Sequence, residues 1–150
     1  MSQSLAKNLI HLVFSTKDRV QFIQDEFRAD LHDYAGGILR DLDSPALLMN
    51  SVADHIHVLF NLHKTKAMSD VIMELKRGTS IWVKDQKSRY GHFYWQAGYG
   101  AFSVSQSAVE TVKEYIADQE SHHSRRTFQD EFRLLLDRHE IPFDERYVWE

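Results

Sequence analysis

Two histidines separated by a single residue, His55 and His57, are the part of the chain best suited to chemistry. Apolar residues alternate with them through residues 54–60, and this pattern predicts a β-strand. Because side chains alternate between the two faces of a strand, both imidazoles are expected on the same face. Two adjacent imidazoles form half of a site for a divalent metal ion, although a polar pair on a solvated strand face would show the same spacing.

A second group of reactive side chains follows on a predicted helix near residue 115. Tyr115, Gln119 and His123 are four residues apart in turn, so they are expected along one stripe of that helix. A phenol could serve as a nucleophile, and an amide oxygen could bind a metal. A helical tyrosine can also simply pack its ring and hydrogen-bond through its hydroxyl. Tyr99 is the competing nucleophile, but it has no potential ligand at helical spacing.

Length and composition indicate one soluble globular domain spanning residues 1–150. Hydrophobic residues make up 43% of the chain and charged residues 27%, as is ordinary for such proteins. The absence of cysteine excludes disulfides, thiol chemistry and cysteine-bound zinc. The chain has no apolar run near the roughly 20 residues of a membrane span, and no signal peptide, so we expect a cytoplasmic protein without a membrane partner.

The charge is unevenly distributed, although the net value is only −4. Residues 64–89 contain seven basic and three acidic residues, whereas residues 127–150 contain seven acidic residues and three arginines. A basic face can attract a nucleic acid even on an acidic protein, although solvated helix faces could also explain the pattern. The residues that we expect to contact a nucleic-acid backbone are Lys76, Arg77 and Lys84. Trp95 and Phe102 could stack bases or belong to the core.

Periodicity gives the order of the remaining elements. We predict strands at residues 9–15 and 46–52 and around His55, and helices at 24–40 and 68–87. The aromatic segment 93–104, which two glycines interrupt, is predicted to form a short strand, then a flexible turn, then an extended lead-in to the next helix. Capping signals at Ser107 and Thr127 begin two further helices. This order predicts an α+β fold: a ferredoxin-like (RNA-recognition-type) antiparallel sheet with helices on one face, plus a C-terminal tyrosine-bearing helix. Ile56, Val58, Phe60 and Leu62 are the expected core residues, which would place the histidines on an open face.

Three motifs in this order and spacing resemble one protein family. They are the His55–Ile56–His57 strand, the segment WQAGYGAFSV at residues 95–104, and the helical YIADQ at residues 115–119. Together they resemble the single-tyrosine transposases of the HUH endonuclease superfamily, which include the REP-associated tyrosine transposases. The resemblance extends over nearly the whole chain.

The resemblance implies roles for individual residues. His55, His57 and Gln119 would bind a divalent metal, Mg²⁺ or Mn²⁺, and Tyr115 would attack single-stranded DNA near a hairpin to form a 5′-phosphotyrosine. It also implies a homodimer with composite active sites, in which the tyrosine helix of one chain serves the histidines of the other. Gly98 and Gly100 could free the backbone for such an exchange.

Two other functions fit the same fold. A non-catalytic module could bind single-stranded nucleic acid on the sheet without the histidine, tyrosine and glutamine set. A metal hydrolase could use the metal without a covalent tyrosine intermediate. A covalent protein–DNA adduct would separate both from a transposase.

Overall fold

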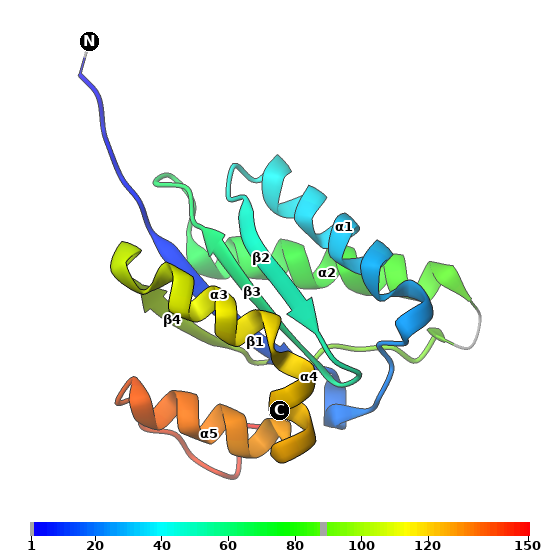
Figure 1. The fold of residues 1–150 in the computed structure, drawn as a ribbon. Coiled ribbons are helices and arrows are strands. Elements are labelled where there is room, and N and C mark those ends of the chain that lie inside the picture. Colours follow the sequence, from blue (N-terminus) through cyan, green and yellow to red (C-terminus); the bar gives the residue numbers. More distant parts are fainter. Residues whose placement is uncertain (1, 88–89) are drawn as a thin grey trace.

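The computed structural model describes residues 2–87 and 90–150, apart from the side chains of residues 122–124. Four antiparallel strands form one sheet in the order β2-β3-β1-β4 (Figure 1). Its elements are β1 (Leu9–Ser15), α1 (Asp25–Asp41), β2 (Ala46–Ser51), β3 (His55–Asn61), α2 (Met68–Gln86) and β4 (Gly100–Val104). The predicted ferredoxin-like fold is confirmed, and the predicted boundaries of the first five elements differ only at their ends. Strand β4 begins at Gly100, in the part of segment 93–104 predicted as a turn and an extended lead-in, so the predicted position of this strand is wrong. In the part of the chain that the structure describes, no helix is both long and apolar enough to cross a membrane.

Helices α1 and α2 lie side by side on one face of the sheet, where the main core forms (Figure 1). The predicted core residues of β3 point to this face, and Ile56, Val58 and Phe60 are each at most 2% exposed. They pack with Leu12 and Phe14 of the paired strand β1. Alternation of apolar residues therefore predicted this face correctly.

The other face of the sheet was expected to be open, and that expectation is wrong. Helices α3 (Val109–Ala117), α4 (Gln119–Arg125) and α5 (Phe128–Arg138) follow the sheet, and α3 and α5 lie across this second face (Figure 1). Leu59 of β3 and Val13 of β1 share the face with the histidines and pack against these helices. Covering these apolar side chains also encloses His55 and His57, which are both 0% exposed.

The predicted tyrosine-bearing helix is divided in two. Helix α3 ends at Ala117, Asp118 forms a turn, and α4 begins at Gln119. The stripe predicted through His123 therefore bends, and the side chain of His123 itself lies outside the described residues. The cap predicted at Ser107 is wrong, because the short helix η3 (Gln106–Ala108) precedes α3 without a side-chain cap. The cap at Thr127 is confirmed, since its side chain accepts a hydrogen bond from the Asp130 backbone N–H at 3.2 Å.

The glycines before the tyrosine helix allow close packing rather than free movement. Gly100 pairs with Val13 in the sheet, and a Cβ atom placed on it would lie 2.5 Å from a ring carbon of Phe132 in α5. The N–H of Gly98 donates to the carbonyl of Glu150 at 2.9 Å. Neither glycine has a positive φ. A bare backbone at Gly100 thus lets α5 approach β4.

Candidate active site

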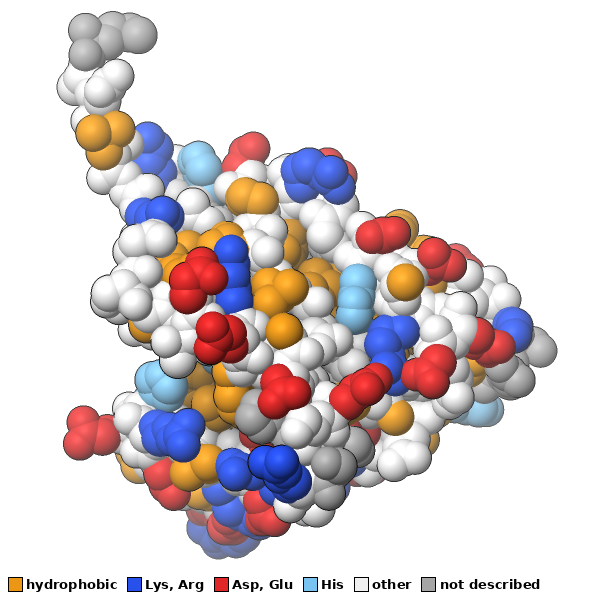
Figure 2. All heavy atoms as spheres, viewed as in Figure 1, with side chains coloured by type: hydrophobic (Ala, Val, Ile, Leu, Met, Phe, Trp, Pro, Cys, Tyr) orange, Lys and Arg blue, Asp and Glu red, His pale blue; other side chains and the backbone are white. Residues whose placement is uncertain are grey.

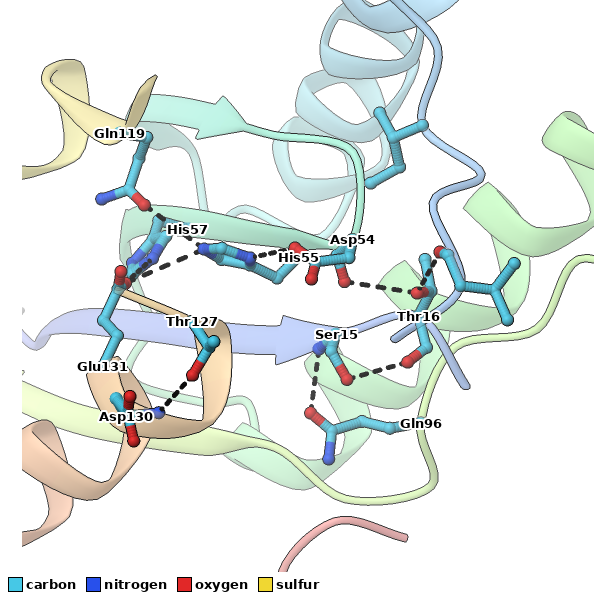
Figure 3. A network of polar contacts seen from close by, with 12 residues as sticks. Ser15, Thr16, Asp54, His55, His57, Gln96, Gln119, Thr127, Asp130 and Glu131 are labelled. Atoms are coloured by element: carbon cyan, nitrogen blue, oxygen red, sulfur yellow. Dashed lines mark hydrogen bonds and ion pairs between the residues drawn. The ribbon is translucent and has the colours of Figure 1, made fainter. Parts of the chain in front are cut away.

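The two histidines lie at the middle of the sheet, and each is oriented by a different neighbour. The Nδ1 atom of His55 is 2.6 Å from Asp54 Oδ1, and that of His57 is 2.9 Å from His11 Nε2. Both Nε2 atoms then point into the space between the sheet and α5 (Figure 3). Holding one ring nitrogen so that the other faces a ligand is the usual way in which proteins orient metal-binding histidines. Burial and the neighbouring His57 lower the pKa of His11 to about 3, so this orienting ring is neutral at physiological pH.

Glu131 of α5, which was not predicted from the sequence, completes a cluster with the two histidines. Its Oε1 atom lies 2.6 Å from His57 Nε2 and 3.8 Å from His55 Nε2, and the side chain is 1% exposed (Figure 3). Burial alone would raise the pKa of Glu131, but the hydrogen bond and charge of His57 outweigh it and lower this pKa to about 2. A signal was available, because Glu131 interrupts the apolar stripe of α5 formed by Phe128, Phe132 and Leu135.

Gln119 reaches the same cluster from the start of α4. Its Oε1 atom is 3.4 Å from His55 Nε2, and its amide donates to the backbone carbonyl of Tyr115 at 3.2 Å. The side chain is fully buried. The structure thus brings all three predicted metal ligands together.

The donor set fits a divalent metal ion. The ligand atoms of His55, His57 and Glu131 lie within 4.8 Å of one another, and the Gln119 oxygen adds a fourth donor beside His55. Imidazole nitrogens combined with carboxylate and amide oxygens suit transition metals such as Mn²⁺ better than Mg²⁺, which prefers oxygen alone. The carboxylate supplies the negative charge that the three predicted neutral ligands lack.

Tyr115 lies next to these residues in the same chain. Its ring centre is 5.8 Å from that of His57 and 6.1 Å from that of His11, and the Glu131 carboxylate lies close enough to influence its pKa. Burial and the Glu131 carboxylate raise the pKa of Tyr115 above its ordinary value near 10. The phenol is therefore protonated at neutral pH, and it requires activation before it can attack.

The residues predicted to contact DNA lie elsewhere, on α2 across the sheet from the histidines. The ammonium of Lys76 donates to the carbonyls of Gln96, Ala97 and Gly98 at 2.7, 3.2 and 2.9 Å. Burial lowers the pKa of Lys76 to about 8. In this structure Lys76 therefore holds the aromatic segment in place, and its contact with DNA stays a prediction.

Arg77 and Lys84 are also engaged within the chain. Arg77 pairs with the Glu74 carboxylate at 2.8 Å, and the Lys84 ammonium lies 4.0 Å from the centre of the Tyr94 ring. Trp95 and Phe102, considered as base-stacking residues, are 8% and 2% exposed and pack in the core. The predicted phosphate contacts at Arg77 and Lys84 remain predictions.

Comparison with known protein families identifies the chain. Residues 4–119 match the family described as IS200-like transposases. The chain belongs to this family. The matched segment contains both histidines, Tyr115 and Gln119, whereas Glu131 lies beyond it.

Individual relatives of this IS200-like transposase are distant in sequence. The ISDra2 transposase TnpA of Deinococcus radiodurans is 23% identical over 114 residues, which cover 73% of this chain and 81% of the relative. A crystal structure assigned to a transposase of Deinococcus radiodurans R1 superposes with a TM-score of 0.62 at 21% identity, covering 79% of this chain and 98% of that one. A REP-associated tyrosine transposase bound to a REP hairpin gives 0.60 at 15% identity, covering 82% and 74%. These structures share the fold of this chain.

Proposed function

We propose that this transposase cleaves and rejoins single-stranded DNA beside a hairpin, with Tyr115 as the nucleophile. The observation that carries the proposal is the position of the Tyr115 ring, whose centre is 5.8 Å from that of His57 and 6.1 Å from that of His11. A reactive side chain of the expected type thus lies beside a buried cluster of metal-ligand type. The structural relative bound to a REP hairpin supports hairpin DNA as the substrate class.

The reaction exchanges one ester bond for another. Tyr115 Oη would bond to phosphorus, and the bond from phosphorus to the 3′ oxygen would break. The phenol loses its proton and the departing oxygen gains one, which leaves a 5′-phosphotyrosine and a free 3′-hydroxyl. Attack by another 3′-hydroxyl reverses the step and joins new ends without ATP, because the ester bond is conserved.

We propose that His55, His57, Gln119 and Glu131 hold a divalent metal ion, Mn²⁺ or Mg²⁺. When bound, such an ion would offset the negative charge of the Glu131 carboxylate and of the reacting phosphate. Asp54 and His11 would keep the imidazole rings turned toward it. Lys76, Arg77 and Lys84 are proposed as contacts to the DNA backbone away from this centre.

The sequence resemblance predicts a homodimer with composite active sites. The described chain places Tyr115 beside its own histidines, which favours a site formed within one molecule. The composite dimer that the resemblance implies is the alternative arrangement, and the subunit mixing described below distinguishes the two.

A covalent adduct is the test of this function. The substrate is a labelled pool of single-stranded DNA hairpins with randomised flanks, incubated with Mn²⁺ and separated on a denaturing gel. The wild type and the control Tyr147→Phe, which alters an exposed phenol in the C-terminal tail, should both form an adduct. Tyr115→Phe should form none yet still bind the pool, because phosphate contacts elsewhere hold the DNA.

Other results would identify the alternative functions. Binding of the pool without cleavage by any variant would indicate a non-catalytic nucleic-acid module. Cleavage without an adduct would indicate a metal hydrolase. An adduct that persists in Tyr115→Phe would move the nucleophile to another tyrosine, with Tyr99 the next candidate.

A further inference from the structure

A cavity of about 300 Å³ lies between β4, α3 and the C-terminal end of α5. Much of its wall is apolar or aromatic, formed by Phe102 of β4, Val112 and Tyr115 of α3, and Leu135 of α5. Figure 2 shows hydrophobic side chains between the two helices, with a histidine and basic side chains close by. This size is at the lower end of the range for small-molecule pockets, roughly 300–1,000 Å³.

The cavity reaches the proposed active site. Tyr115 and His11 both line it, and His11 Nε2 is 2.9 Å from His57 Nδ1. A molecule bound in the cavity would therefore lie beside the proposed nucleophile, and only His11 would separate it from His57, a proposed metal ligand.

The side chains at the rim of the cavity suit a phosphate group. Arg138 contributes a guanidinium, and Ser103, Ser105 and Thr111 contribute hydroxyls. Among the described residues that line the cavity, none is acidic. The positive charge of Arg138 is also felt at Tyr115, where it opposes the rise in the phenol pKa. Arginine binds phosphate oxygens well because its donors are planar and paired.

The exposed ring of His139 offers an aromatic surface to a nucleobase, and buried Phe102 supports this ring from below. The ring of His139 stacks on that of Phe102 with centroids 4.3 Å apart and planes inclined by 25°, and both rings line the cavity. Every base has a π-face that can pack on such rings, whatever its sequence. The cavity therefore combines a surface for a base with a cation for its phosphate.

We infer that this cavity binds one nucleotide of the cleaved strand, with the base against the aromatic wall and its phosphate at Arg138. The inference rests on the proposed function, because it places this nucleotide next to the phosphate that Tyr115 attacks. It assigns to α5 a part in substrate binding, in addition to the metal ligand proposed at Glu131.

Titration with free nucleotides tests the cavity without requiring cleavage. The probes are the four deoxynucleoside 5′-monophosphates, with deoxyribose 5-phosphate as the probe that lacks a base, followed by NMR of the labelled protein. We expect saturable shifts for residues 102–112 and His139 with at least one nucleotide, and clearly weaker binding of deoxyribose 5-phosphate, which keeps the phosphate contact but lacks the base. Equal binding of deoxyribose 5-phosphate, or no saturable shifts, would overturn the inference.

Two exposed positions allow variants that leave the core intact. Arg138→Gln removes the cation, and Thr111→Trp places a large ring at the cavity mouth. Nucleotide affinity should fall about tenfold in the first, as expected for a lost charge-assisted contact, and binding should vanish in the second. Arg40→Gln is the matched control, since it removes the same charge from the end of α1 and should bind like the wild type. Wild-type affinity in both cavity variants would refute the assignment.

The two proposals can fail separately. If nucleotides bind in the cavity but no adduct forms with the hairpin pool, the cavity stands and the proposed cleavage does not. If the adduct forms and Thr111→Trp still binds nucleotides at the same residues, the cleavage stands and the cavity assignment is wrong.

Discussion

The orientation of His55 and His57 is set by the residues that contact their Nδ1 atoms. Asp54 directly precedes β3, in the turn that joins it to β2, and its carboxylate is 2.6 Å from His55 Nδ1. A carboxylate in this position fixes the ring and makes the other nitrogen a better ligand. The sequence contains this aspartate beside the histidine, but only the fold shows that the two side chains meet.

Asp54→Asn should weaken metal binding without changing a ligand. Loss of such an orienting partner usually lowers metal affinity by about 10–100-fold, and we expect a decrease near the lower limit because the amide oxygen can still accept the hydrogen bond. Isothermal titration with Mn²⁺ measures the change. Asp30→Asn, which alters an exposed residue of α1, should bind Mn²⁺ like the wild type. Unchanged affinity in Asp54→Asn would contradict the role of Asp54.

Glu131→Gln should make the Tyr115 phenol easier to ionise. Burial raises the pKa of Tyr115 first, and the nearby Glu131 carboxylate raises it further. Removing the carboxylate removes the contribution of Glu131 to the raised pKa of Tyr115, so phenolate should form at lower pH than in the wild type. Phenolate absorbance during an alkaline titration, compared with the same proteins carrying Tyr115→Phe, isolates this tyrosine. Glu114→Gln, an exposed change on the same helix, should leave the titration unaltered, and an equal shift in both variants would oppose a direct contact.

At the scale of elements, local patterns predicted the sheet and its first two helices but not what covers the histidine face. Alternation identified Ile56 and Val58 as core residues because period 2 is a local property of a strand. The burial of His55 depends on α5, which lies far along the chain, and no local pattern specifies that contact. The break at Asp118 was missed for a similar reason: helical spacing continues through residues that the tertiary fold bends apart.

Gly100 tests how tightly α5 is held on the sheet. Gly100→Ala should lower the free energy of unfolding by about 1–3 kcal/mol, because the new Cβ would lie 2.5 Å from the Phe132 ring. Gly36→Ala, inside α1 with open space around it, should instead raise the free energy of unfolding by up to about 1 kcal/mol. Urea unfolding of both variants gives the comparison. Equal effects would show that close packing is not the reason for glycine at residue 100.

At the scale of the molecule, the sheet is a layer between two groups of helices, with the site beneath the C-terminal group (Figure 1). The fold class, the histidine pair, Tyr115 and Gln119 were all predicted from the sequence, because family motifs and periodicity carry them. Glu131 and the cavity were not, since both are created where α5 packs against elements distant in sequence.

Subunit mixing tests whether one molecule forms the whole site. Mixing Tyr115→Phe with His57→Ala should give no cleavage. Each chain holds its own Tyr115 beside its own His57, so every site in the mixture would carry one of the two substitutions. In a composite dimer, a mixed pair would have one intact site, and cleavage would partly return. Recovery of activity would therefore establish the exchanged arrangement predicted from the family resemblance. Exchange is monitored with differently labelled chains.

The position of the covalent bond decides whether Tyr115 is the nucleophile. The adduct formed by the wild type with the hairpin pool is digested with protease and nuclease, and the modified peptide is sequenced by mass spectrometry. We expect a phosphodiester that joins the 5′ end of the DNA to Tyr115. Attachment to Tyr99 or any other residue, with Tyr115 unmodified, would contradict this role of Tyr115.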